Sequence, residues 1–261
     1  MYVIDHLSVS QINMFSRCEL QWFLKYVEGF RYPSSSALVR GKAVHIGLAD
    51  IYTSIQREKR YYPDKTIDLV ADYVSRSDRM EEVNWSDPKF KVKDIAVSLI
   101  KCYIDNQYPD KIEADSIESV EVKIQHVLYS DEGEKIKIIG YPDVTLTDKI
   151  IDFKTKSRKP SGIDIEYRFQ TAFYSTALGK SKVELQYLIS KKTPEIICLN
   201  TGINNNLKAI SRNIFIKTYK KIKAGLQSGN FLPTGIFHPW ACNLCGFKSI
   251  GKCPYDLRYA A

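Results

Sequence analysis

The spacing of apolar residues predicts helices over most of the first half of the chain and in two later segments. Apolar residues recur three and four positions apart, as at Val44 and Leu48, which indicates helices that each bury one face. Ser8 or Ser10 would cap the first helix, and Gly29 would end it. We expect helices at Leu7–Phe30, Arg40–Gln56, Thr66–Glu82, Pro88–Asn106, Asp164–Leu178 and Leu207–Gln227.

Alternating apolar and polar residues predict strands from the middle of the chain onward. Val120 and Val122 alternate with polar neighbours, so we expect one strand within Ser116–Ser130, followed by a turn at residues 131–133. The stretch Ile139–Lys156 has the composition of two short strands with a tight break at Thr147-Asp148. Further strands are expected at Lys135–Tyr141, Val183–Ser190 and Glu195–Asn200.

Length and composition are those of an ordinary globular protein. The 261 residues are enough for one large domain or for one domain with a subdomain, and 44% hydrophobic with 26% charged residues are typical proportions. The sequence has no run of about 18 apolar residues that would predict a membrane span. The first residues lack the basic start and apolar core of a signal peptide. We therefore expect a cytoplasmic protein without a membrane partner.

The net charge of +8 is distributed unevenly. From Lys149 to the end, 19 Lys and Arg residues stand against 6 Asp and Glu, which leaves 19 against 24 for the part before it. A basic segment of this size is typical of a protein that binds a polyanion. A lysine-rich surface that only aids solubility explains the charge equally well.

Two carboxylates and an amine are expected to meet in the stretch Ile139–Lys156. Side chains alternate along a strand, so Asp152 and Lys154 point to the same side, and a hairpin would bring Asp143 close to Asp152. Paired carboxylates repel unless a cation lies between them, and hard oxygen ligands select Mg²⁺ or Mn²⁺. Such an ion activates water for attack on a phosphate. The alternative is a surface hairpin with an ordinary Asp–Lys pair.

Three cysteines near the C-terminus have the spacing of metal ligands. They form the pattern Cys242-x₂-Cys245-x₇-Cys253, and Cys18 is the candidate for a fourth ligand that would tie the chain ends together. In a reducing compartment this pattern favours a metal or a cluster over disulfides. A four-cysteine zinc site is one solution, and Cys18 taken alone is more often a small core residue.

The order of these residues resembles a known family. Pro142-Asp143, eight further residues and then Asp152-Phe153-Lys154 reproduce the pattern of the PD-(D/E)XK nuclease superfamily. The N-terminal Leu-Ser-x-Ser opening, followed by Cys18 and by Lys25-Tyr26, is similar to the RecB-like and AddB-like branch, which includes CRISPR-associated exonucleases with an iron–sulfur cluster. The likeness runs from Leu7 to Cys253.

The resemblance assigns roles that the residues alone do not. Gly41 and His45 are similar to the first motif of RecB-like nucleases, in which the histidine is a metal ligand, whereas a lone helical histidine is usually structural. Gln170 and Tyr174 match the last motif, whose side chains line the DNA path, although core-edge polar residues are the simpler interpretation. Glu121 could face the metal, but an outward orientation on its strand is favoured.

The resemblance implies an α/β fold with a restriction-endonuclease-like core, in which a mixed central sheet is flanked by helices. Residues 1–261 would form a single nuclease domain, with a helical insertion at 57–115 and a cysteine segment at 231–261 that closes onto Cys18. The implied function is a Mg²⁺- or Mn²⁺-dependent DNA exonuclease acting on single-stranded ends in recombination, repair or mobile-element processing.

The implied ligands of the divalent ion are His45, Asp143, Asp152 and the carbonyl of Phe153. Lys154 would position water and phosphate, and Gln170 and Tyr174 would orient the strand. Phosphate contacts are expected from Lys156, Arg158 and Lys159. The implied ligands of a [4Fe–4S] cluster are Cys18, Cys242, Cys245 and Cys253.

Two other classes of protein fit the sequence. One is a DNA-binding scaffold within a recombination complex, with little nuclease activity of its own and with a helicase or recombinase as partner. The other is a zinc-bound interaction protein, in which the cysteines matter and the Asp–Lys hairpin does not.

Overall fold

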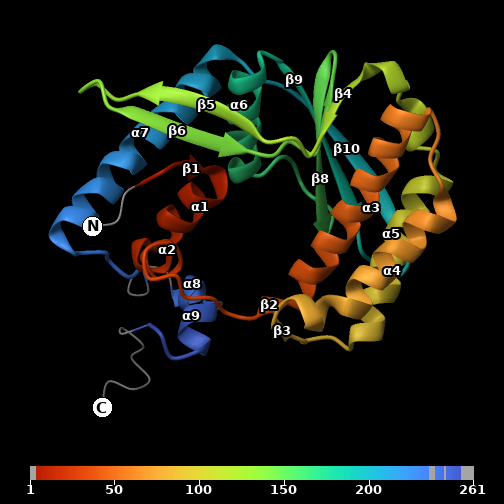
Figure 1. Ribbon diagram of the computed structural model, residues 1–261, viewed down its shortest axis with the longest axis horizontal. Coiled ribbons are helices and arrows are strands. Elements are labelled where there is room, and N and C mark those ends of the chain that lie inside the picture. Colours follow the sequence, from red (N-terminus) through yellow and green to blue (C-terminus); the bar gives the residue numbers. More distant parts are fainter. Residues whose placement is uncertain (1–3, 235–238, 244, 254–261) are drawn as a thin grey trace. The chain divides into compact units, whose positions relative to one another are not determined.

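The computed structural model describes residues 4–234, 239–243 and 245–253, and the chain divides into two compact units. Residues 34–124 and 141–208 form one, here called the sheet unit. Residues 1–33, 125–140 and 209–261 form the other, here called the hairpin unit. Figure 1 shows the elements of both. Among the described helices, none is long and apolar enough to cross a membrane.

The sheet unit is built on a mixed sheet of five strands in the order β10-β9-β8-β7-β4. The pairs β4–β7, β7–β8 and β9–β10 are antiparallel, whereas β8 and β9 are parallel and are joined through helix α6 (Ile165–Leu178). This arrangement confirms the expected α/β class with a mixed central sheet. The strands are β4 (Ile117–Val120), β7 (Val144–Leu146), β8 (Lys149–Lys156), β9 (Lys182–Ile189) and β10 (Glu195–Gly202).

Helices cover both faces of this sheet. On one face α3 (Ser36–Glu58) and α5 (Lys89–Asp105) pack against the strands, and α4 (Pro63–Met80) packs beside them, as Figure 1 shows. Gly47 permits this close packing, because a Cβ atom there would lie 2.6 Å from Val70 Cγ2. The buried core joins these helices to the strands through Tyr52, Tyr103 and Phe153. On the opposite face lies α6.

Short elements connect these helices and strands. The two-residue strands β2 (Ser34–Ser35) and β3 (Val83–Asn84) pair in parallel, and two single 3₁₀ turns, Pro109–Lys111 and Ala114–Ser116, lead from α5 into β4. The Ser35 hydroxyl accepts a hydrogen bond from the backbone N–H of Leu38 and caps α3. The predicted helices and strands of this unit are confirmed to within a few residues at their ends.

One predicted strand is wrong in its extent. The segment Ser116–Ser130 was expected to run as a single strand, but it is divided into β4 and β5 (Ile124–Tyr129), which belong to different sheets. Glu121 lies at the break with φ +50°, a left-handed conformation that non-glycine residues rarely adopt. Its backbone N–H donates to the Asp143 carbonyl at 2.9 Å. The alternating sequence gives no sign of this turn.

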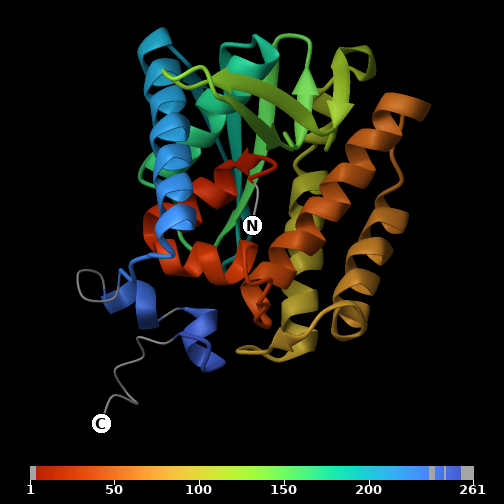
Figure 2. The same cartoon turned by 60° about the vertical axis from the view of Figure 1, so that its left-hand side comes forward.

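The hairpin unit contains a second sheet of three strands in the order β1-β6-β5. Strand β1 (Leu7–Ser8) pairs in parallel with β6 (Lys135–Gly140), and the predicted turn between β5 and β6 is confirmed, with Gly133 at φ +79°. Helix α7 (Asn205–Ser228) runs alongside this hairpin (Figure 2). The short helices α8 (Pro239–Asn243) and α9 (Gly246–Ser249) follow it in the chain.

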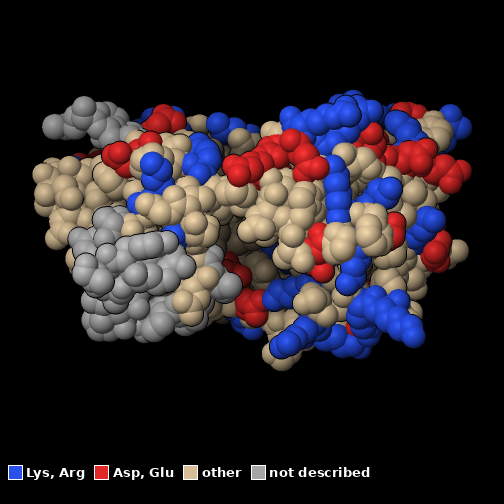
Figure 3. Space-filling view, turned by 90° about the horizontal axis from the view of Figure 1, so that it is seen from below, with Lys and Arg blue, Asp and Glu red and all other residues tan. Residues whose placement is uncertain are grey.

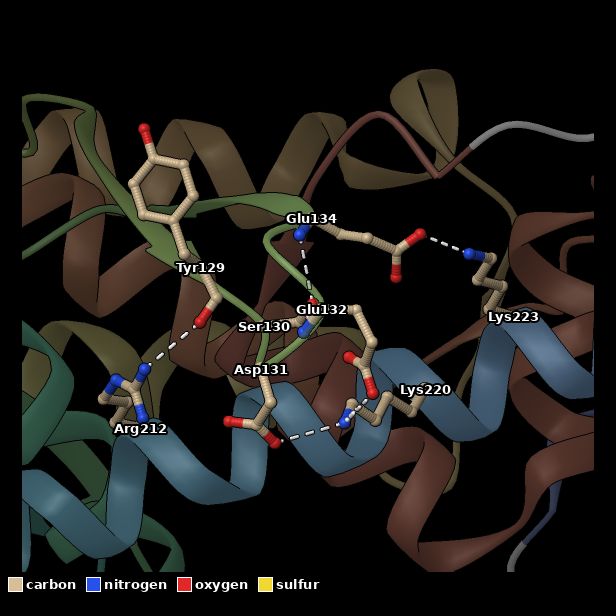
Figure 4. A network of polar contacts seen from close by, with 8 residues as sticks. All are labelled: Tyr129, Ser130, Asp131, Glu132, Glu134, Arg212, Lys220 and Lys223. Atoms are coloured by element: carbon tan, nitrogen blue, oxygen red, sulfur yellow. Dashed lines mark hydrogen bonds and ion pairs between the residues drawn. The ribbon is translucent and has the colours of Figure 1, made fainter.

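Polar contacts attach the tip of the hairpin to α7, as Figure 4 shows. Arg212 donates to the Tyr129 carbonyl at 3.1 Å, and Lys220 lies 3.2 Å from Asp131 and 2.7 Å from Glu132. Lys223 pairs with Glu134. The acidic turn therefore pairs with Lys220 and Lys223 of α7. From the charge distribution alone, these lysines would be assigned to the binding of a polyanion.

The predicted N-terminal helix is also interrupted. In place of one helix over Leu7–Phe30, the structure has β1, α1 (Val9–Arg17) and α2 (Glu19–Tyr26). Cys18 separates the two helices with an extended backbone at φ −165°, and α2 ends at Tyr26 before reaching Gly29. Ser8 caps α1 as expected, because its hydroxyl accepts from the Gln11 N–H. Cys18 therefore caps the start of α2 instead of lying inside one long helix. The apolar spacing continues through this position, so the sequence does not predict the break.

Candidate active site

The β7–β8 hairpin brings the two predicted aspartates of the sheet unit together. Val144 pairs with Ile151 and Thr145 with Ile150, so Asp143 lies where β7 begins, beside Asp152 on β8. The Asp143 carboxylate accepts a hydrogen bond from the Phe153 backbone N–H at 2.6 Å. Asp152 is buried, with 1% of its surface exposed. The backbone of the hairpin therefore fixes the position of both carboxylates.

Helix α3 places His45 against the same hairpin. Its Nδ1 atom lies 3.1 Å from Asp143 Oδ1, and its ring meets the Phe153 ring edge-on at a centroid distance of 6.3 Å. Gly41, one turn earlier, lets the helix approach β8, since a Cβ atom there would come within 3.3 Å of Thr155 Oγ1. In the Gly-x-x-x-His spacing, Gly41 thus allows close contact between α3 and β8, and His45 one turn later reaches Asp143.

Lys154 pairs with Asp152 and belongs to the same group of side chains. Its ammonium forms an ion pair with Asp152, and the two side chains are 15% and 2% exposed. Burial lowers the pKa of Lys154, but the charges of Asp152 and Asp143 outweigh it, so the pKa rises and the ammonium stays protonated. The amine is therefore available as a fixed positive charge and a hydrogen-bond donor.

The two carboxyl groups differ in their electrostatic surroundings. Burial raises the pKa of Asp143, but the His45 ring and the donors around it outweigh burial and lower the pKa below its ordinary value. Burial and the charge of Asp143 raise the pKa of Asp152 despite the opposing effect of Lys154. A cation beside the two carboxyl groups would favour the ionised form of both.

Glu121 is an exposed residue that lies near these side chains, a position that the sequence did not favour. Single ligand atoms of His45, Glu121 and Asp143 all lie within 4.8 Å of one another. The left-handed turn at Glu121 aims its carboxylate here, whereas a continuous strand was expected to point it outward. Partial burial and the charge of Asp143 raise the pKa of Glu121. No sequence signal announces the turn, because glutamate is not a residue typical of this conformation.

One imidazole and three carboxylates in this arrangement suit a hard divalent cation. Mg²⁺ and Mn²⁺ prefer oxygen ligands, and a divalent ion among the carboxylates would relieve their mutual repulsion. The donors His45, Glu121 and Asp143 lie close enough together to fit such an ion, and Asp152, which pairs with Lys154, lies beside Asp143 in the hairpin. The geometry alone does not assign these residues a role in catalysis.

Gln170 and Tyr174 lie on one face of α6, four residues apart. Gln170 Nε2 donates to the Tyr174 hydroxyl at 2.9 Å, and this hydroxyl donates to the Tyr141 carbonyl at 3.1 Å. Tyr141 is two residues before Asp143, so the pair holds the chain that enters the site. Burial and the nearby Asp152 raise the pKa of Tyr174, which remains a neutral donor.

The three basic residues after β8 are not equally available to a ligand. Lys156 forms an ion pair with Asp164, and Lys159 lies 3.0 Å from Glu195, while Arg158 is exposed. Figure 3 shows the same intermingling of Lys and Arg with Asp and Glu over one face of the molecule. Exposed pairs of this kind are weak and exchange readily with other anions.

The four predicted cysteine ligands come together in the hairpin unit. Cys18, Cys242, Cys245 and Cys253 line one pocket. Cys18 lies between α1 and α2, and Gln21 Nε2 lies 3.8 Å from the sulfur of Cys245. Gly246 permits close packing beside the pocket, because a Cβ atom there would overlap the Tyr32 ring at 2.2 Å. Segments from the two ends of the chain therefore share a thiol-lined site.

The mixed sheet with paired acids and a lysine on its central hairpin defines a nuclease fold. The chain belongs to the PD-(D/E)XK nuclease superfamily, whose family model matches residues 6–254. Members of this superfamily use divalent metal ions, in agreement with the donor set described above. Comparison with curated proteins gives no match.

One solved structure shows the same fold at low identity. A candidate exonuclease from Eubacterium rectale superimposes with a TM-score of 0.59 at 16% identity, over 88% of this chain and 85% of that one. An alkaline exonuclease from Laribacter hongkongensis matches with a TM-score of 0.35 at 10% identity, over 72% of this chain and 94% of that one. The first likeness extends across both units, and the second carries no argument.

Proposed function

We propose that this protein is a Mg²⁺- or Mn²⁺-dependent deoxyribonuclease that removes nucleotides from single-stranded DNA ends. The observation that carries the proposal is the convergence of His45, Asp143, Asp152 and Lys154 at the β7–β8 hairpin of a nuclease-family sheet. The name of the similar structure from Eubacterium rectale, a candidate exonuclease, supports the choice of ends over internal sites.

His45, Asp143, Asp152 and the Phe153 carbonyl would hold the divalent ion, and Glu121 joins them because its carboxylate lies beside His45 and Asp143. The ion supplies an activated water and compensates the charge that develops on the phosphate. Lys154, protonated beside Asp152, would orient the attacking water and stabilise the pentavalent phosphate. Asp143 keeps its charge because His45 and the Phe153 N–H stabilise it.

Gln170 and Tyr174 would orient the strand by fixing the backbone at Tyr141. Lys156, Arg158 and Lys159 would contact phosphates without reading bases, and Lys156 and Lys159 would exchange their acid partners for DNA. Such contacts fit a cytoplasmic enzyme that trims ends during recombination, repair or mobile-element processing, alone or beside a helicase or recombinase.

Degradation of end-labelled oligonucleotides in Mn²⁺ tests this function. The wild-type protein should shorten single strands faster than blunt duplexes, and Lys154→Ala should lower the rate by about 10²- to 10⁴-fold. Lys149→Ala, which removes a lysine of the same strand that pairs with Glu184, is the matched control for folding. Equal rates for the wild-type protein and Lys154→Ala would refute the mechanism, and an inactive wild-type protein would favour a scaffold.

We further propose that Cys18, Cys242, Cys245 and Cys253 hold a [4Fe–4S] cluster. Four thiols around one pocket at the junction of the chain ends support this assignment. Anaerobically purified protein should be brown and should contain iron and acid-labile sulfide. Colourless protein with one equivalent of zinc would replace the cluster by a four-cysteine zinc site.

A further inference from the structure

Tyr167 on α6 lies between two lysines of β8. Its ring centroid is 4.8 Å from the Lys154 ammonium and 5.1 Å from the Lys156 ammonium. Lys154 and Lys156 point to the same side of the sheet because they are two residues apart on a strand. One aromatic ring therefore contacts both cations on that side of β8.

Each lysine also has its own acid. Lys154 pairs with Asp152 and Lys156 with Asp164, whereas the Tyr167 ring contacts both ammonium groups. A second ring, Tyr187, lies 5.6 Å from the Lys156 ammonium and 6.3 Å from the Tyr167 ring. The electron-rich faces of these rings attract cations that would otherwise repel each other.

The Tyr167 hydroxyl is not an anionic partner for these lysines. Burial raises the pKa of Tyr167 to about 12, with help from the charges of Glu166 and Asp164, so the phenol is neutral at physiological pH. The attraction to Lys154 and Lys156 must come from the ring itself. A phenylalanine would keep this attraction, and an aliphatic side chain of similar size would lose it.

We propose that Tyr167 is a positioning residue that holds Lys154 and Lys156 as a pair, with Lys154 set for the scissile phosphate and Lys156 for a neighbouring phosphate of the same strand. This inference rests on the proposed nuclease function for its substrate. It assigns the two lysines different consequences: loss of Lys154 alignment slows the chemical step, and loss of Lys156 alignment weakens DNA binding.

Kinetics on a single-stranded oligonucleotide test the proposal. Tyr167→Leu should lower kcat about threefold to thirtyfold and raise KM, which is the range that one partly buried cation–π contact supports. Tyr167→Phe should retain most of both parameters. In a Lys154→Ala background, Tyr167→Leu should lower kcat no further but should still raise KM through Lys156. An equal kcat loss in both backgrounds, or a Phe variant as impaired as the Leu variant, overturns the proposal.

A control variant separates this effect from general destabilisation. Tyr62 contacts Arg60 at 4.9 Å and Lys65 at 5.9 Å after the end of α3, so Tyr62→Leu removes a similar contact away from the hairpin. It should leave kcat and KM unchanged. If Tyr167→Leu does not fold, Tyr167→Met serves in its place, because it also fills the volume without a ring.

A spectroscopic measurement tests the contact independently of nuclease activity. With ¹³C-labelled lysine, the ε-CH₂ signals of Lys154 and Lys156 should be shifted upfield by the Tyr167 ring and can be assigned from Lys154→Arg and Lys156→Arg variants. Both signals should move downfield in Tyr167→Leu and stay near their places in Tyr167→Phe. Signals that do not move overturn the inference even if the protein is an active nuclease, and signals that move uphold the contact even if it is not.

Discussion

The carboxylate site and the cysteine pocket are assembled in different ways. In the sheet unit, hydrogen-bonded strands and one long helix set the positions of His45, Asp143 and Asp152. In the hairpin unit, Cys242 and Cys245 lie on or beside helices of five and four residues, too short to be stable alone. The fold alone therefore positions the residues of the carboxylate site. Around the cysteine pocket, a bound metal or cluster is expected to stabilise the fold.

The largest effect is expected on the cleavage rate of a variant of Asp143. Asp143→Asn keeps the acceptor for the Phe153 N–H but removes the charge that a divalent ion needs, so cleavage should fall by about 10²- to 10⁴-fold with little change in the melting temperature. Mn²⁺ titration by calorimetry and a thermal melt measure the two quantities on one sample. A collapse of the melting temperature would show that this site, too, supports the fold.

In the cysteine pocket, by contrast, a substitution should lower the melting temperature. Cys18→Ser removes one of its four thiols and should lower the melting temperature of the hairpin unit by at least about 5 °C, because the proposed cluster would couple ligand binding to folding. Cys102→Ser, which changes a cysteine of α5 in the sheet unit, is the matched control. Differential scanning calorimetry in the absence of oxygen measures the shift. If the two variants melt alike, the pocket holds no structural ligand.

The sequence predicts some features of the two sites and misses others. Strand alternation placed Asp152 and Lys154 on one side, and the hairpin brought Asp143 to them, because both rules act over a few residues. The break at Cys18 and the left-handed Glu121 escaped prediction, since apolar spacing continues through both. The contact of Tyr167 with two lysines depends on how α6 packs across the sheet, which local pattern does not encode.

A smaller effect tests whether Glu121 belongs to the carboxylate site. Glu121→Gln keeps the shape of the side chain but removes its charge beside His45 and Asp143, so Mn²⁺ affinity should fall about tenfold. Glu118→Gln changes a carboxylate of the same segment, which pairs with Lys180 at 3.0 Å. It should leave Mn²⁺ affinity unchanged in calorimetry. An equal response of the two variants would show that the exposed Glu121 is not a metal ligand.

The smallest effect separates the backbone of Glu121 from its carboxylate. The left-handed conformation costs a non-glycine residue on the order of 1 kcal/mol, so Glu121→Gly should raise the free energy of unfolding by about 0.5–1 kcal/mol while it weakens Mn²⁺ binding as Glu121→Gln does. Lys59→Gly is the matched control, because Lys59 ends α3 at φ +60°. Urea denaturation should show a similar gain for Lys59→Gly without any loss of metal affinity. A gain at Lys59 but none at Glu121 would mean that contacts of the carboxylate already offset the cost of its turn.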